Sequence, residues 1–344
     1  MTTSLFRQSF LLDTLTDEAS GTWAEKTLAS GVTLKWHQRG VLEVIPVHLQ
    51  PETQHVVLSC AIHGDETAPM ELLDSLINDI IAERQPIAAR CLFIVAHPEA
   101  TQQHVRFIEQ NLNRLFDNKP HEPSKERDIA EELKRIVAQF YAETEPQTRW
   151  HLDLHCSIRA SKYATFAISP KTRHPVRSKA LFDFVAQAQL RAVLLSNAPS
   201  NTFSWYSAEH YGAQALTLEL GQVARLGEND LSQLTKFDAA LRALVSAAPR
   251  AESQSDADVA MYRVSRTIVR QSEDFHFLFD NDIENFTTFK HGEVFGHDGE
   301  KPLMAKNEEE AIVFPNAQVA IGQRAALMVC AVDTRYEQDQ LVYD

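Results

Sequence analysis

The tetrapeptide His63-Gly64-Asp65-Glu66 combines residue types and a spacing that could bind a metal ion. It follows an apolar run at 55–62, so a tight turn at the end of a strand could direct His63 and Glu66 toward one point. An imidazole and a carboxylate are two of the three protein ligands of a catalytic zinc that keeps a position open for water. Taken alone, the pattern is better explained by an exposed histidine and a dipole-favouring glutamate at a helix N-terminus, because short motifs often match by chance.

A third ligand is expected from another strand end, and His155 closes a predicted strand at 150–155. His151, Asp153 and His155 share one face of that strand. Three polar residues on one face are costly in an apolar core unless they serve a site. Asp153 could orient the His155 imidazole, whereas His151 is the weaker metal candidate because it lies deeper along the strand. The alternative is that both histidines are ordinary, partly buried residues with polar contacts.

Glu219 lies near the end of a predicted strand at 214–220, on the face opposite three leucines. A carboxylate in an otherwise apolar strand is costly unless it is paired or catalytic. Beside a metal, it could act as the general base that takes a proton from the attacking water. The alternative is a strand-end glutamate paired with a surface lysine or arginine.

Arg106, Asn113 and Arg114 lie in residues 99–123, which show no sustained periodicity and are predicted to form a long active-site loop. Arginine binds carboxylates through paired hydrogen bonds. The chain has 33 lysines and arginines against 47 acidic residues, a net charge of −14. Cations gathered beside a metal in such a protein indicate a small anionic substrate, although a salt-bridged surface loop is the usual alternative.

Short β-like runs alternate with helical patterns over most of the chain, which predicts an α/β domain. The predicted strands are 55–62, 91–96, 150–155, 192–196 and 214–220. The predicted helices are one through Leu73–Ile80, one through Ile129–Phe140 with Ser124 as its N-cap, and two near 177–190 and 229–246. The polar stretch 248–258 is predicted to link a domain of residues 1–247 to a smaller, β-rich domain of residues 259–344.

Composition excludes several classes of function. The net charge argues against nucleic acid or an anionic membrane as the main partner. The four cysteines form no C-x-x-C pair, and no apolar run approaches the roughly 20 residues of a membrane-spanning helix. We therefore expect a soluble, cytoplasmic protein, and a homo-oligomer is compatible with the sequence.

Taken in chain order, His63-x-x-Glu66, Arg106, Asn113-Arg114, Asp153-x-His155 and Glu219 resemble the zinc carboxypeptidase superfamily, and most closely its aspartoacylase and succinylglutamate desuccinylase branch. The resemblance spans roughly residues 55–221. It implies a mixed central sheet flanked by helices, with a smaller β-rich C-terminal domain. The segments NLNRLF and HLDLHCSIR are most similar to the succinylglutamate desuccinylase members, which act in bacterial arginine catabolism.

Carried over residue by residue, the resemblance implies one zinc ion per chain, bound by His63, Glu66 and His155. Glu219 would be the general base, Arg106 would polarise the scissile carbonyl, and Asn113 and Arg114 would hold a substrate carboxylate. The implied reaction is hydrolysis of a small anionic N-acyl amino acid, with N-succinyl-L-glutamate as the favoured substrate. Three alternatives stay open: another N-acyl amino acid deacylase, a metallocarboxypeptidase, and a metal-binding scaffold without catalytic activity.

Overall fold

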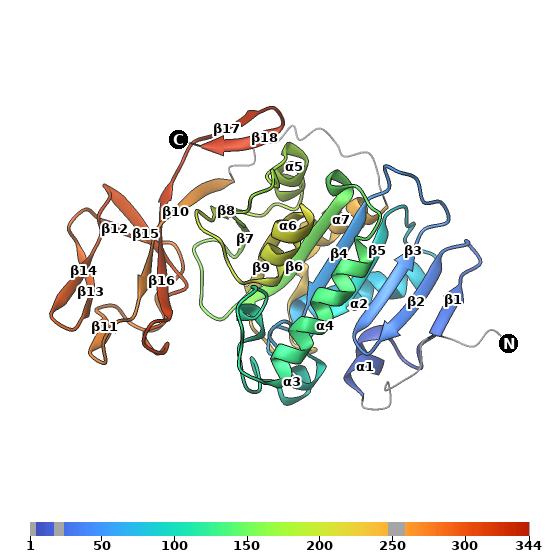
Figure 1. Cartoon of the computed structure of the whole chain (residues 1–344), viewed down its shortest axis with the longest axis horizontal. Coiled ribbons are helices and arrows are strands. Elements are labelled where there is room, and N and C mark those ends of the chain that lie inside the picture. The colour runs from blue at the N-terminus through green and yellow to red at the C-terminus, as the bar shows by residue number, and fades with distance from the viewer. Residues whose placement is uncertain (1–4, 17–23, 247–258, 344) are drawn as a thin grey trace.

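The structure is a computed structural model that describes residues 5–16, 24–246 and 259–343. The strands before residue 247 are β1 (Ala24–Thr27), β2 (Thr33–Gln38), β3 (Val41–Ile45), β4 (His55–Cys60), β5 (Arg90–Val95), β6 (Arg149–Ser157), β7 (Thr165–Ser169), β8 (Ala192–Leu195) and β9 (Gln214–Gln222). Those after residue 258 are β10 (Ala260–Val269), β11 (Phe275–Phe277), β12 (Thr287–Lys290), β13 (Val294–Asp298), β14 (Lys301–Met304), β15 (Glu309–Val313), β16 (Arg324–Ala331), β17 (Thr334–Glu337) and β18 (Gln340–Tyr343). Thirteen of these strands form one mixed sheet in the order β1-β2-β3-β5-β4-β6-β9-β7-β8-β10-β16-β15-β12 (Figure 1).

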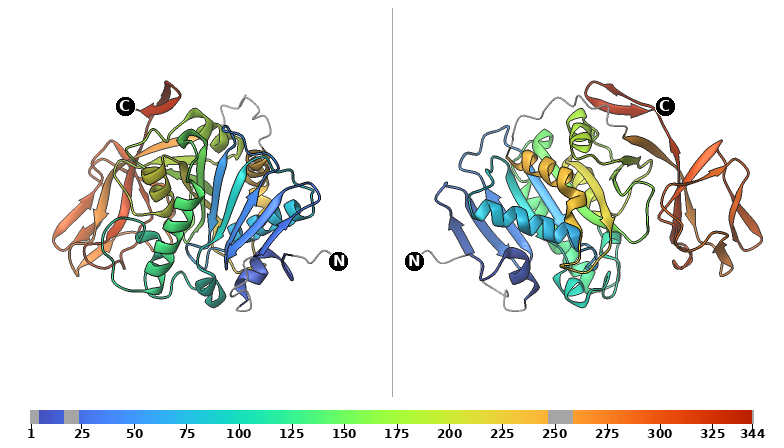
Figure 2. Two further views of the ribbon diagram at one scale, coloured as in Figure 1. Left: turned by 45° about the vertical axis from the view of Figure 1, so that its right-hand side comes forward. Right: turned by 180° about the vertical axis from the view of Figure 1, so that it is seen from behind.

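Helices cover both faces of the central strands (Figure 2). They are α1 (Phe10–Leu15), α2 (Ala68–Ile81), α3 (Pro98–Gln103), α4 (Lys125–Phe140), α5 (Lys179–Gln187), α6 (Phe203–Tyr211) and α7 (Thr235–Val245). β4 is buried throughout, and its side chains alternate between the two faces. Val56 and Leu58 join the core beneath α2, α5 and α7, whereas Val57 joins the core beneath α4 and α6. A strand buried on both faces explains why 55–62 reads as a continuous apolar run.

The predicted elements of the α/β region are confirmed to within a few residues. The Ser124 side chain accepts a hydrogen bond from the backbone N–H of Arg127, so the predicted N-cap is also confirmed. The expectation that 99–123 lacks regular structure was wrong in part, because α3 and a single 3-10 turn, η2 (Leu112–Arg114), lie in or beside it. Helices this short give no detectable periodicity in the sequence.

Residues 259–343 contain only strands among their regular elements, which confirms the predicted β-rich tail. Their relation to the rest of the fold was not predicted. β10 pairs in parallel with β8, so the C-terminal strands extend the central sheet. The β17–β18 hairpin returns to the main body, where Leu341 enters the same core as α5 (Figure 1). The predicted linker 248–258 lies outside the described residues, and the division into residues 1–247 and 259–344 stays a prediction.

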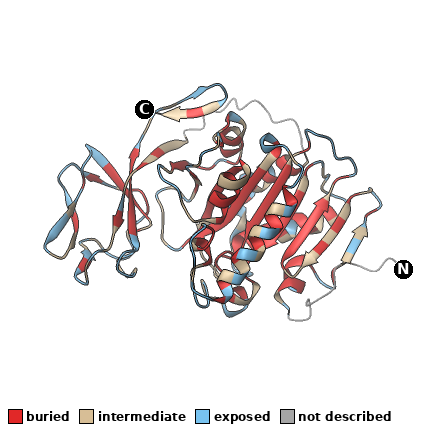
Figure 3. Ribbon diagram, in the orientation of Figure 1, coloured by how far each residue is buried: buried red, intermediate tan, exposed pale blue. Residues whose placement is uncertain are grey.

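The strands of the sheet differ in how deeply they are buried. β4, β6 and β9 are buried along almost their whole length, whereas the outer C-terminal strands are exposed at many positions (Figure 3). Polar side chains at the ends of β4, β6 and β9 are therefore held in low-dielectric surroundings. No helix in the described part of the chain combines the length and apolar composition that a bilayer crossing requires.

Candidate metal and catalytic site

Three adjacent parallel strands bring the predicted site residues together. β4 pairs with β6, and β6 pairs with β9, so their carboxyl ends reach the same edge of the sheet. His63 follows β4, His155 lies in β6, and Glu219 lies in β9 directly opposite His155 in the register. Ligand sites of α/β sheets form at this edge because the chain leaves every parallel strand there.

Gly64 allows the turn after β4 to pack against its neighbours. A Cβ atom at this position would lie 2.3 Å from the backbone carbon of Ala100, in α3. The Gly64 N–H also donates to the backbone oxygen of Arg106 at 3.1 Å. The structure shows that the clash avoided is with α3, and that the same turn anchors the segment carrying Arg106.

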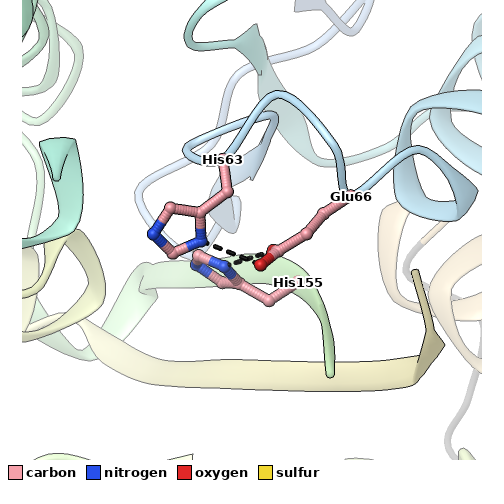
Figure 4. A group of neighbouring side chains, drawn as sticks. All are labelled: His63, Glu66 and His155. Atoms are coloured by element: carbon pink, nitrogen blue, oxygen red, sulfur yellow. Dashed lines mark hydrogen bonds and ion pairs between the residues drawn. The ribbon is translucent and has the colours of Figure 1, made fainter. Parts of the chain in front are cut away.

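His63, Glu66 and His155 form a group whose candidate ligand atoms all lie within 4.8 Å of one another, and all three residues are buried (Figure 4). Both imidazoles direct Nδ1 at the carboxylate: His63 Nδ1 lies 2.9 Å from Oε1, and His155 Nδ1 lies 2.8 Å from Oε2. Among the described residues, the group has these three members. Two imidazoles and one carboxylate match the donors of a catalytic zinc site with an open position.

Electrostatics keeps this group charged despite its burial. Burial alone would raise the pKa of Glu66, but the charges and hydrogen bonds of His63 and His155 lower it well below its usual range. Burial opposes protonation of His155, yet the carboxylates of Asp153 and Glu66 raise the pKa of His155 well above its ordinary value. For His63, burial outweighs the attraction of Glu66 and lowers the pKa. A deprotonated carboxylate is thus fixed at the centre of the group.

Other polar side chains hold the two imidazoles in place. Asp153 Oδ2 lies 3.0 Å from His155 Nε2, and Ser59 donates to Asp153 Oδ1 at 2.5 Å. Asn111 Oδ1 lies 3.0 Å from His63 Nε2. Each ring therefore has a polar partner at Nε2, and this contact orients its Nδ1 toward Glu66. The sequence analysis anticipated Asp153 but missed Ser59 and Asn111, because isolated serines and asparagines carry no pattern that reveals a tertiary partner.

His151 is buried and does not belong to the metal-binding group. Its Nε2 lies 2.8 Å from Ser59 Oγ, and its Nδ1 lies 2.7 Å from Ser207 Oγ on α6. Burial is the main cause that lowers the pKa of His151, to about 4, so the ring is neutral at physiological pH. It therefore links β4, β6 and α6 as an uncharged polar residue.

Replacing Asp153 with asparagine should weaken metal binding by about 10- to 100-fold, the usual cost of losing a partner that orients a ligating histidine. The amide removes the negative charge that faces His155 Nε2. Competition with a chromophoric chelator would measure the affinity for zinc. D183N is the matched control, because Asp183 is a partly exposed residue that pairs with Lys179 in α5. Equal zinc affinities for D153N and D183N would contradict this role of Asp153.

Glu219 is buried and lies beside the metal-binding group rather than in it. Ser157 donates to its Oε2 at 3.1 Å. Burial, followed by repulsion from Glu66, raises the pKa of Glu219 to about 7. Within the described residues, Glu219 forms no salt bridge with a lysine or arginine. The interpretation of a surface-paired glutamate is therefore wrong, and a carboxylate that can gain and lose a proton near neutral pH remains.

The predicted loop residues, two arginines and an asparagine, lie around the same edge of the sheet. Arg106 donates from Nη1 to Glu66 Oε1 at 2.7 Å and keeps part of its side chain accessible. The side-chain nitrogen of Asn113 lies 3.4 Å from His155 Nε2, and its oxygen accepts from the backbone N–H of Phe203. Arg114 is half-buried and donates to the backbone oxygen of Asn113. The structure thus brings all three residues to the site, with Asn113 packed into its wall.

Comparison with known proteins agrees with this arrangement. Residues 52–245 match the family described as the succinylglutamate desuccinylase/aspartoacylase catalytic domain, and residues 257–332 match the AstE/AspA barrel-sandwich hybrid domain. A succinylglutamate desuccinylase from Vibrio campbellii is 65% identical over 344 residues, which is 100% of both chains.

Solved structures extend the similarity to the fold. The succinylglutamate desuccinylase of Vibrio parahaemolyticus aligns with a TM-score of 0.96 at 65% identity, covering 99% of this chain and 100% of that chain. That of Chromobacterium violaceum aligns with a TM-score of 0.81 at 33% identity, covering 94% and 97%. The resemblance seen in the sequence motifs is confirmed over both regions of the fold. The chain belongs to the succinylglutamate desuccinylase/aspartoacylase family.

Proposed function

We propose that this chain is a zinc-dependent hydrolase that converts N-succinyl-L-glutamate and water into succinate and L-glutamate, in arginine catabolism. The observation that carries the reaction class is the buried His63–Glu66–His155 group beside a carboxylate, Glu219, that titrates near neutral pH. The choice of substrate rests on full-length relatives named for this activity at 65% identity.

His63 and His155 through Nδ1, and Glu66 through its carboxylate, would hold one zinc ion per chain. Their donor set suits zinc, which accepts nitrogen and oxygen ligands and works with three protein ligands in catalytic sites. When bound, zinc would supply Lewis acidity, which polarises a carbonyl group and makes water more acidic. A scaffold site would instead be closed by a fourth protein ligand, which the group of three does not include among the described residues.

Glu219 would move the proton. Its carboxylate takes a proton from the water that attacks the amide carbon, and the resulting carboxylic acid gives that proton to the amide nitrogen as the C–N bond breaks. A single group serves both steps best when its pKa lies near the working pH, and the value of about 7 meets this condition. Ser157, which donates to Oε2, fixes the orientation of the carboxylate.

Arg106 and Arg114 would bind the negative charges. Arg106, which lies against Glu66, would donate to the carbonyl oxygen as charge develops on it. Arg114, supported by Asn113, would hold a carboxylate of the substrate. N-succinylglutamate is a small molecule with three carboxylates, which accounts for the gathering of arginines in a protein of net charge −14. The cytoplasmic location and the oligomeric state stay predictions from the sequence.

A panel of substrates tests the proposal. The zinc-loaded protein would be assayed with N-succinyl-L-glutamate, N-acetyl-L-aspartate and a peptide with a free carboxyl terminus. We expect the highest kcat/KM with N-succinyl-L-glutamate. Preference for acetylaspartate would assign the chain to aspartoacylase-like deacylases, and preference for the peptide would assign it to carboxypeptidases. Metal binding without hydrolysis of any of the three would favour a scaffold.

A further inference from the structure

Arg324 stands at the start of β16, in the C-terminal part of the chain, and its side chain is accessible to water. Its guanidinium carbon lies 5.9 Å from the ring centroid of Phe314. No carboxylate in the described ranges forms an ion pair with it, although this protein has an excess of acidic residues. An arginine that packs on an aromatic ring and has no carboxylate partner can direct its N–H donors to an anion.

A chain of contacts connects Arg324 to the catalytic strands. The Phe314 ring packs against the Phe166 ring, with centroids 5.8 Å apart. Phe166 lies in β7 and is paired in the register with Glu219 of β9. Two aromatic rings therefore separate the guanidinium of Arg324 from the strand that carries the proposed base. Because directly paired residues share one face of a sheet, these contacts link Arg324 to the face that carries Glu219.

The backbone of Phe314, whose ring contacts Arg324, is fixed by hydrogen bonds. Phe314 has φ of +56°, a left-handed conformation that a bulky residue adopts only where its surroundings enforce it. Its backbone N–H donates to Asn285 Oδ1 at 2.7 Å. The Asn285 backbone in turn donates to the oxygen of Ala160 and accepts from the N–H of Lys162. Because 160–162 belong to the loop that follows β6, the C-terminal strands are fastened directly to the strand of His155.

Arg324 also belongs to a cluster of cations. Burial, then the charges of Arg324 and Arg106, lower the pKa of Arg114 to about 9. Among the described residues, the Arg114 side chain donates to the backbone oxygen of Asn113 and not to a carboxylate. Of these three arginines, Arg106 is paired with the Glu66 carboxylate, whereas no carboxylate among the described residues pairs with Arg114 or Arg324. Like charges held close together are unfavourable, and a ligand with several negative charges would relieve their repulsion.

We propose that Arg324 is a specificity-determining residue, which binds the substrate carboxylate most remote from the scissile amide bond. This inference rests on the proposed function and assigns, for N-succinyl-L-glutamate, the γ-carboxylate of the glutamate part. Arg106 contacts Glu66, and Arg114 is bonded to Asn113 beside His155, so both serve positions near the reacting amide. Arg324 is linked to the strand of Glu219 through the rings of Phe314 and Phe166, so it would meet a part of the substrate farther from the reacting amide.

Steady-state kinetics with two substrates tests this assignment. N-succinyl-L-glutamine replaces the γ-carboxylate with a neutral amide and keeps every other group. We expect R324Q to raise KM for N-succinyl-L-glutamate by about 10- to 100-fold, the range for a lost hydrogen bond between charged groups, with kcat changed by less than about threefold. KM for N-succinyl-L-glutamine should not change. R324K, which keeps the charge, should recover part of the affinity.

R335Q is the matched control, because Arg335 pairs with Glu337 on the exposed β17–β18 hairpin, and it should leave KM for both substrates unchanged. Zinc content and thermal unfolding midpoints, compared among the variants, would reveal a folding defect. If the wild type hydrolyses N-succinyl-L-glutamate but R324Q raises KM for both substrates equally, or for neither, the Arg324 assignment alone is overturned. If the zinc-loaded wild type hydrolyses neither substrate, the proposed function fails and the assignment fails with it.

Discussion

The variant E219Q is expected to lose about 10³-fold in kcat while it binds as much zinc as the wild type. Glutamine has nearly the same shape as glutamate, but its amide cannot take a proton from water, and general base catalysis contributes about 10²- to 10⁴-fold. Glu219 lies outside the three-residue ligand group, so metal binding should persist. Turnover of N-succinyl-L-glutamate and zinc content per chain would be measured on the same preparation. Wild-type turnover by E219Q would contradict the assignment of the base.

The same substitution should stabilise the metal-free protein. The pKa of Glu219 is about 7 in the folded chain and 4.5 in an ordinary environment, so folded protein holds an extra proton between these pH values. The free energy of unfolding therefore falls as pH rises from about 4.5 to about 7. Glutamine does not titrate, so chelator-treated E219Q should exceed the wild type by about 3 kcal/mol above pH 7 and match it below about pH 4.5.

E310Q provides a control in which the free energy of unfolding at neutral pH should change in the opposite direction. Glu310 is also buried, but it pairs with Arg266. Burial raises its pKa, and the hydrogen bond from Arg266 is the largest of the effects that overcome burial and lower it. E310Q should therefore lose stability at neutral pH and keep the kcat of the folded enzyme. Urea unfolding of E219Q, E310Q and the wild type at pH 4.5 and pH 8 would measure these changes in the free energy of unfolding. A gain in E219Q of equal size at both pH values would indicate improved packing instead of a buried titrating carboxylate.

The candidate site could be predicted from the sequence because its residues occupy unusual positions in simple patterns. Glu219 is a carboxylate in a largely apolar strand, and His155 shares one strand face with two other polar residues. The cost of burying such residues in a core indicates a function. His63 and Glu66 follow the end of a third such strand. Parallel pairing in an α/β fold brings such strand ends to one edge of the sheet. Local patterns were therefore sufficient to predict that these distant residues lie close together.

Other features depend on tertiary contacts, which no short pattern in the sequence reveals. Helix α6 is buried on nearly every side through its first two turns, so it lacks the amphipathic pattern by which helices are recognised. The pairing of β8 with β10 joins regions separated by a polar stretch, and strand sequences do not specify their partners. Arg324 was missed for the same reason, because its nearest neighbours in the sequence have no relation to the site.

Replacing either histidine of the metal-binding group should remove both zinc and activity. H63A and H155A each take away one of three protein ligands, and we expect zinc affinity to fall by more than about 100-fold, since losing only an orienting partner costs up to that much. Without the ion, kcat should fall by about 10³-fold or more, because metal catalysis supplies several kcal/mol. Chelation should inactivate the wild type, and added zinc should restore it. Zinc bound to H155A with wild-type affinity would contradict the proposed ligand set.

The two histidine variants should differ in one respect, which depends on charge in the metal-free protein. His155 lies between Asp153 and Glu66, and its raised pKa means that it carries the positive charge that balances these buried carboxylates. Removing it leaves Asp153 without a partner charge and Glu66 paired with Arg106 alone, and an uncompensated buried charge typically costs about 3–5 kcal/mol. His63 has a lowered pKa and is neutral, so its removal takes away no charge. Chelator-treated H155A should therefore unfold at lower urea concentration than chelator-treated H63A at pH 7. The opposite order would show that His63, and not His155, carries the balancing proton.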